Sequence, residues 1–118
     1  HLHILVNGCY SPGELSHQDT RFEMLSRVLA GIHREEIALA VPVAAAMAEA
    51  TGLPAYRYQT PVARPVGGSE FVYARNLLAN RLYQCPVIYL EPYVMNHQET
   101  YQRLRRGHWV GRTLIGDR

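Results

Sequence analysis

The chain has 118 residues, of which 47% are hydrophobic and 19% charged, and its formal net charge is +2. This length predicts one domain with a core of its own, and the composition excludes an intrinsically disordered chain. The longest apolar stretch, residues 37–47, is shorter than the ~20 residues that a membrane span needs, and the small net charge argues against a dedicated nucleic-acid-binding protein.

The expected elements begin with a strand over residues 1–6, and residues typical of turns follow it as far as Asp19. Asp19 or Thr20 is suited to cap a helix that runs to about residue 30 and stops at Gly31. The apolar residues of this helix recur at helical spacing. They are Phe22, Leu25, Val28 and Leu29.

A second helix is expected over residues 34–51, and Gly52 is suited to end it. Pro42 inside this pattern predicts a kink or a later start of the helix. Residues 56–59 have the composition of a short strand, and residues 61–68 have that of a loop.

Ser69 is suited to cap a third helix over residues 70–83, and residues 87–90 form an apolar run typical of a buried parallel strand. A last helix is expected after Asn96, and the tail from Gly107 is expected to be weakly structured. The alternation of strands and helices predicts an α/β fold, with a layered, mostly parallel sheet and helices packed on its faces. Residues 1–118 are expected to form a single domain.

Two histidines, His1 and His3, lie two residues apart on the first strand and therefore share one face of it. Ligands of open α/β sheets collect at the carboxyl ends of the strands, and two imidazoles on one face can bind a divalent metal with one more ligand. The alternative is that either histidine packs or forms a hydrogen bond at a sheet edge. The spacing makes both residues candidate metal ligands.

Glu91 follows directly on the apolar run of residues 87–90. A carboxylate at the end of a buried strand is partly removed from water, which suits a general acid or base. The alternative is a structural carboxylate that pairs with one of the arginines. The strand and its terminal glutamate make Glu91 a candidate catalytic residue.

The segment from Pro86 to Glu99 resembles the C-terminal signature of the zinc-dependent N-acetylmuramoyl-L-alanine amidases of the amidase-3 type. In that family an apolar strand led by proline ends in a catalytic glutamate, and an asparagine, an acidic residue and a leucine follow it. Glu91, Asn96, Glu99 and Leu104 stand at the corresponding places. The opening strand, followed by Asn7, resembles the strand that carries a metal-binding histidine in the family.

This chain also departs from the family pattern. Asn7 lies four residues after His3 instead of two, and Pro92-Tyr93 stands where the family has Gly-Phe after its glutamate. The family's first histidine and its glutamate ligand, which precede this region, have no counterpart here. The chain is therefore expected to be the C-terminal portion of such a catalytic domain.

The resemblance implies a zinc-dependent hydrolase. His3, or alternatively His1, is then one of three zinc ligands, and Glu91 acts on the zinc-bound water and afterwards on the leaving amine. The bond cleaved is the amide between the lactyl group of muramic acid and L-alanine. The resemblance further implies peptidoglycan or a muropeptide as substrate and a place in the cell envelope, either periplasmic or extracellular. The small net charge predicts no nucleic-acid partner.

Two other functions are compatible with the sequence. One is a non-catalytic α/β module that binds a glycan or a peptide through its tyrosines and its arginine-rich tail, and the other is a different metal-dependent amidohydrolase. The two cysteines, Cys9 and Cys85, are compatible with one disulfide or with two buried thiols. The oxidising envelope that the resemblance implies favours the disulfide.

Overall fold

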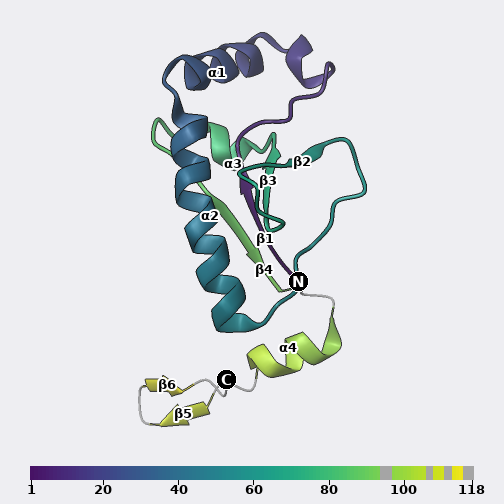
Figure 1. Cartoon of the computed structure of the whole chain (residues 1–118), viewed down its shortest axis with the longest axis vertical. Helices are drawn as coiled ribbons and strands as arrows, with labels where there is room; N and C mark the ends of the chain where they lie inside the picture. Colours follow the sequence, from purple (N-terminus) through teal and green to yellow (C-terminus); the bar gives the residue numbers. More distant parts are fainter. Residues whose placement is uncertain (94–96, 106–107, 111–112, 116–118) are drawn as a thin grey trace.

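The computed structural model describes residues 1–93, 97–105, 108–110 and 113–115. In chain order the elements are β1 (Leu2–Val6), a 3₁₀ turn (Glu14–Ser16), α1 (Gln18–Leu29), α2 (Ile32–Thr51), β2 (Ala63–Pro65), β3 (Val72–Arg75), α3 (Leu78–Arg81), β4 (Tyr89–Pro92), α4 (Gln98–Arg105), β5 (His108–Val110) and β6 (Thr113–Ile115). Figure 1 shows the long helix α2 lying along one face of a small sheet, with α1 beyond the upper end of that sheet. The expected α/β class is confirmed.

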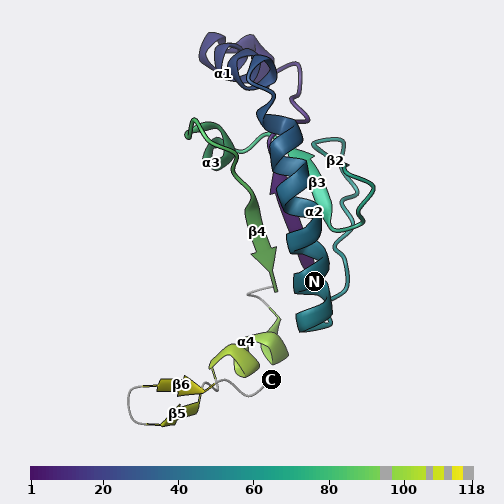
Figure 2. The ribbon, with the colours of Figure 1, turned by 60° about the vertical axis from the view of Figure 1, so that its left-hand side comes forward.

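The main sheet has four strands in the order β2-β3-β1-β4. Only the central pair, β1 with β3, is parallel, whereas β2 pairs with β3 and β4 pairs with β1 in antiparallel fashion. The described strands thus form a mixed sheet where a mostly parallel one was expected. A parallel neighbour needs a long crossover, which α1 and α2 supply between β1 and β3, but the only helix between β3 and β4 is the four-residue α3. The chain therefore turns at α3, as Figure 2 shows, and β4 runs back antiparallel to β1.

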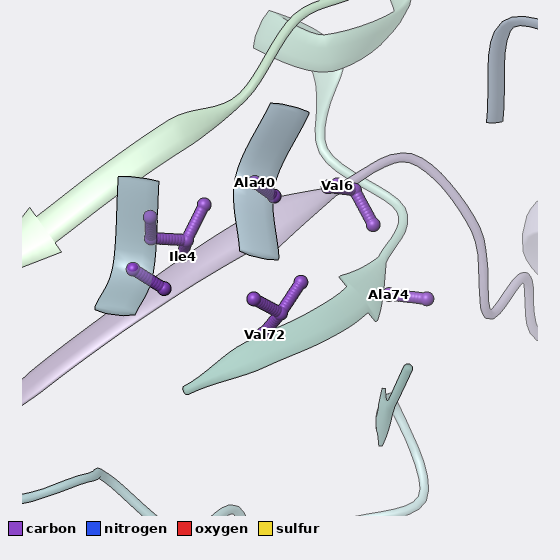
Figure 3. Close-up of a cluster of buried hydrophobic side chains, with 6 residues drawn as sticks. Ile4, Val6, Ala40, Val72 and Ala74 are labelled. Atoms are coloured by element: carbon purple, nitrogen blue, oxygen red, sulfur yellow. The ribbon is translucent and has the colours of Figure 1, made fainter. Parts of the chain in front are cut away.

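The main core lies between the sheet and α2. Alternate residues of β1 and β3 point toward the helix, and two alanines one turn apart on α2 let the layers approach closely. Figure 3 shows these side chains meeting; the buried cluster consists of Ile4, Val6, Ala40, Ala44, Val72 and Ala74. The opposite face of the sheet holds a smaller cluster of Leu5, Ala63 and Tyr73, against which Tyr58 and Leu77 pack.

Both long helices end next to the glycines that predicted their C-terminal ends. Gly31, with φ of 71°, separates α1 from α2, and Gly52, with φ of 65°, follows the last residue of α2 in the left-handed conformation. α2 starts two residues earlier than expected, at Ile32, and continues through Pro42. His17 occupies the position before α1, so the helix begins earlier than either predicted cap.

α1 turns its charged side toward the protein. Arg27 pairs with the fully buried Glu36, and Glu23 pairs with Arg81 of α3. Helical spacing shows that a helix has an apolar side, but these ion pairs decide which side packs inward. The apolar residues at helical spacing are consequently exposed, namely Phe22 (74%), Leu25 (53%), Val28 (63%) and Leu29 (86%).

Residues 70–83 were expected as one helix, and this prediction is wrong. The segment forms β3 and the short α3 instead. Val72 and Tyr73 favour strands, and Val72 pairs with Ile4 of β1, a contact that local spacing does not reveal. The predicted strand at 56–59 is also absent; the chain there makes only an isolated bridge, between Leu2 and Ala55.

β4 is an exposed edge strand, although residues 87–90 were expected to form a buried one. Tyr89 and Leu90 are 40% and 43% exposed. The strand has one neighbour, β1, and no helix of the described chain covers its outer edge. The apolar run of residues 87–90 therefore predicted a strand correctly, but the prediction that this strand is buried is wrong.

Several C-terminal expectations have mixed outcomes. Asn96, expected to cap the last helix, lies outside the described residues, and His97 instead accepts a hydrogen bond from the backbone N–H of Thr100 at 3.3 Å. In the tail, where weak structure was expected, β5 and β6 pair as an antiparallel ladder. Within the described residues, no helix combines the length and apolar character needed to cross a membrane.

Both cysteines are free thiols in this structure. Cys85 is exposed, while Cys9 is half-buried and its thiol donates to the carbonyl oxygen of Pro61 at 3.3 Å. Neither the disulfide nor the two buried thiols that the sequence allowed are formed.

Candidate functional site

The antiparallel pairing of β1 with β4 brings His3 and Glu91 together. They are direct cross-strand partners, and the Nε2 atom of His3 contacts the Oε2 atom of Glu91. The carboxyl end of β4 meets the amino-terminal half of β1, so the two residues do not gather at the carboxyl ends of both strands as expected. A parallel β4 would have placed them at opposite ends of the sheet.

Tyr58 and Arg75 complete a hydrogen-bonded group around His3. The Tyr58 hydroxyl lies 2.9 Å from the same Nε2 atom, and the Nη1 atom of Arg75 donates to that hydroxyl at 3.5 Å. The Nε2 atom of His3 donates a hydrogen bond when it carries a proton and accepts one when it does not. A protonated Nε2 is able to donate to Glu91, whereas an unprotonated Nε2 accepts from the Tyr58 hydroxyl. The neutral imidazole of His3 can thus carry its single proton either on Nε2, next to Glu91, or on Nδ1.

Aromatic rings surround this group on the face of the sheet opposite to α2. The centroid of the Tyr56 ring lies 4.4 Å from that of His1 and 5.1 Å from that of His3, and the centroids of Tyr58 and Tyr73 are 5.1 Å apart. These separations are typical of favourable aromatic pairs. The rings hold the His3 imidazole in place and shield it from water.

His3 and Glu91 differ in their access to solvent. The side chain of His3 is 4% exposed and that of Glu91 is 39% exposed. Burial lowers the pKa of His3 below its ordinary value, against the opposing effect of the Glu91 carboxylate, and burial raises the pKa of Tyr58. At neutral pH His3 is therefore a neutral imidazole and Tyr58 keeps its proton, while Glu91 is the member of the pair that water or a substrate reaches.

The donors around His3 match a zinc centre only in their chemical type. Two imidazoles and a carboxylate, here His1, His3 and Glu91, form a donor set that zinc hydrolases use. The Nδ1 atom of His3 is buried without a hydrogen-bond partner among the described residues. The ring centroids of His1 and His3 are 5.6 Å apart, a separation that two imidazoles on one zinc ion can have, but no three His, Cys, Asp or Glu side chains in the described part of the chain form a metal-binding group. As they stand, these residues do not fit a three-ligand zinc centre.

Sequence reasoning missed Tyr56, Tyr58 and Arg75. One signal was present, because alternate residues of an extended segment share a side and the Tyr-x-Tyr spacing puts both rings on one side. Nothing local linked this segment to the first strand. The link is the bridge between Leu2 and Ala55, which joins distant parts of the chain.

Comparisons with known proteins provide no relative from which a role for this site could be inferred. No protein-family model, no curated protein and no solved structure matches the chain.

Proposed function

We propose that this chain carries the acid–base centre of a hydrolase that cleaves an amide bond, with Glu91 as the residue that moves the proton. The observation that carries the proposal is the contact of the Glu91 carboxylate with Nε2 of His3, which also meets the Tyr58 hydroxyl. A half-exposed carboxylate held against a buried imidazole is suited to general acid–base catalysis.

In this reaction Glu91 accepts a proton from a water molecule while the water oxygen attacks the carbonyl carbon of the amide. The C–N bond then breaks, and Glu91 returns the proton to the leaving nitrogen, so that amide and water become a carboxylic acid and an amine. His3 and Tyr58 are positioning residues that orient the carboxylate. Arg75 supports them by donating to the Tyr58 hydroxyl.

The substrate and cofactor are proposed on the resemblance of residues 86–99 to the amidase-3 enzymes. The substrate is peptidoglycan or a muropeptide, the bond is the amide between muramic acid and L-alanine, and the location is the cell envelope. Zinc is proposed only on the resemblance and on the imidazole donors His1 and His3, since no three His, Cys, Asp or Glu side chains in the described part of the chain form a metal-binding group. The proton transfers assigned to Glu91 do not depend on the metal.

The test compares Glu91→Gln with Glu70→Gln, the same change at an exposed carboxylate 3.9 Å from Arg57. The full chain is incubated with a muropeptide, with and without added Zn²⁺, and the released amine is measured together with the zinc content. We expect Glu91→Gln to lower the rate by about 10²–10⁴-fold, the usual contribution of a general acid–base, and Glu70→Gln to leave it unchanged. Undiminished turnover in Glu91→Gln, or no amine release by the unmodified chain, contradicts the proposal.

A second candidate is a module that binds a glycan or a peptide without turnover. It is favoured by the half-buried rings of Tyr56 and Tyr58, whose centroids lie 4.8 Å apart beside His1. Such rings offer apolar faces together with hydroxyl groups for a ligand. In that case Tyr56→Ala weakens muropeptide binding, and Glu91→Gln has no turnover to abolish.

A further inference from the structure

The contact of His3 with Glu91 depends on the register between β1 and β4. A shift of β4 by one residue would turn Glu91 to the side of α2 and away from His3. No hairpin turn joins the two strands, since β3 and α3 lie between them in the chain. Tyr89 and Leu90 point to opposite faces and are both about half exposed, so the burial pattern within β4 does not select one register.

The buried carboxylate of Glu36 joins the two strands at the point where their ladder ends. The register of β1 and β4, continued beyond both strands, places Asn7 opposite Val87. The N–H of Asn7 donates to Oε2 of Glu36 at 3.0 Å, and the N–H of Val87 donates to Oε1 at 3.1 Å. Glu36 is fully buried, and its charge is balanced by Arg27. One carboxylate thus holds the end of β1 and the segment that leads into β4.

Asn80 of α3 bridges the same two segments through their carbonyl groups. It is fully buried, and its Nδ2 atom donates to the carbonyl oxygen of Leu5 at 3.1 Å and to that of Val87 at 3.3 Å. Both main-chain polar groups of Val87 are therefore bound by buried side chains. The best-attested role of such buried polar groups is to select one register among several that apolar packing allows.

The bridge is matched to Val87 and not to the residues beside it. A shift of the strand by one residue in one direction brings Pro86, which has no N–H group, to the Glu36 carboxylate. A shift in the other direction brings Ile88, whose N–H points to the opposite edge of the strand, because successive N–H groups of an extended chain alternate in direction. Either shift leaves Glu36 buried without one of its donors, which is unfavourable.

We propose that Glu36 is a positioning residue that, together with Asn80, selects the register of β4 against β1. This register is the one that places the Glu91 carboxylate on Nε2 of His3. The role rests on the proposed function, in which that carboxylate moves the proton. Glu36 acts only through the main chain of the two strands and takes no part in the proton transfer.

The first test is amide hydrogen exchange of the unmodified ¹⁵N-labelled full chain. The amides of Asn7 and Val87 lie outside the ladder, but both are expected to exchange at least about tenfold more slowly than that of Gly68, the effect of a hydrogen bond to a charged group. Gly68 is an exposed residue between β2 and β3, and rates are compared after correction for the intrinsic rate of each residue. A smaller slowing of either amide overturns the proposal.

The second test compares Glu36→Gln with Ile88→Ala. The glutamine keeps the shape of the side chain, but its amide group accepts only one of the two main-chain bonds. Ile88→Ala removes the apolar contact of the neighbouring residue with the main core, the alternative means of fixing the register. The readout is the nuclear Overhauser effect between the α-protons of Ile4 and Leu90, which lie opposite each other only in this register.

We expect this signal to fall several-fold in Glu36→Gln and to persist in Ile88→Ala. An undiminished signal in folded Glu36→Gln, or an equal loss in the two variants, overturns the proposal. If Glu36→Gln does not fold, Asn80→Ala, which leaves the pair of Glu36 with Arg27 intact, is expected to give the same loss, and an undiminished signal there overturns the proposal as well. Neither test requires turnover, so its outcome is distinct from that of the muropeptide assay.

Discussion

The two faces of β1 are equally buried but chemically different. All five residues of the strand are buried. On the side of α2, Ile4 and Val6 pack against alanines of the helix and against β3. On the other side, His3 joins Glu91 and Tyr58 through polar contacts, next to Leu5, which packs in a small cluster with Ala63 and Tyr73. Burial alone therefore does not tell the core side of a central strand from its functional side; the chemistry of alternate residues does.

The two faces of β1 also differ in the interactions that stabilise them. Burying an apolar side chain contributes about 1.5–3 kcal/mol and needs no particular partner geometry. A hydrogen bond contributes about 0.5–1.5 kcal/mol net and only when its partner is correctly placed. The apolar face is thus expected to account for stability, whereas the polar face is expected to account for the proton chemistry.

The largest effect on stability is expected from the apolar face. Ile4→Ala should lower the free energy of unfolding by about 2–5 kcal/mol, because it leaves a cavity against α2 that the surroundings fill only partly. The measurement is urea unfolding of the full chain. The control is Leu90→Ala, at the cross-strand partner of Ile4, which is 43% exposed and should lose less than about 1 kcal/mol. Equal losses in the two variants contradict the conclusion that the core is centred on β1 and α2 and not on the exposed edge strand β4.

A smaller effect is expected from the titration of His3. Because burial lowers its pKa in the folded protein, against the pull of Glu91, the unfolded chain binds a proton at this residue where the folded chain does not. The free energy of unfolding should therefore fall as the pH drops below about 6.5, by up to about 1.4 kcal/mol per pH unit, and should not change through His3 at higher pH.

Urea unfolding between about pH 5 and 7.5, with His3→Gln as the reference, isolates this contribution. The unmodified chain should lose stability relative to the variant on acidification. A relative gain on acidification means that the Glu91 carboxylate outweighs burial, so that the polar face is held by an ion pair. That outcome would reverse the sign of the pH dependence.

The parts of the fold that were predictable depend on local backbone chemistry. Gly31 and Gly52 adopt the left-handed conformation that ends a helix at little steric cost, so the C-terminal ends of α1 and α2 could be inferred. The strand at residues 72–75 could not, because its pairing with Ile4 decides between strand and helix. The inward charged side of α1 likewise depends on the contact of Arg27 with Glu36 across a helix boundary.

The candidate site follows the same division. His3 and Glu91 could be nominated because imidazole and carboxylate are reactive groups wherever they lie. Their contact depends on the antiparallel course of β4, which sequence reasoning expected to be parallel. Tyr58 and Arg75 were missed because each reaches His3 from a different segment, one following α2 and the other on β3. The sequence thus indicated which residue types are reactive, but it did not predict which of them come into contact in the fold.

The smallest effect is expected for Tyr58→Phe, which removes one hydroxyl from the polar face and keeps the ring. Losing the 2.9 Å hydrogen bond to Nε2 of His3 should cost about 0.5–1.5 kcal/mol in the free energy of unfolding. The control is Tyr56→Phe, since the Tyr56 hydroxyl makes no hydrogen bond within the described part of the chain and should cost about nothing. Urea unfolding at neutral pH measures both. Equal costs would mean that ring packing, as on the apolar face, holds His3 in place, and the two faces of β1 would then differ in residue type but not in what stabilises them.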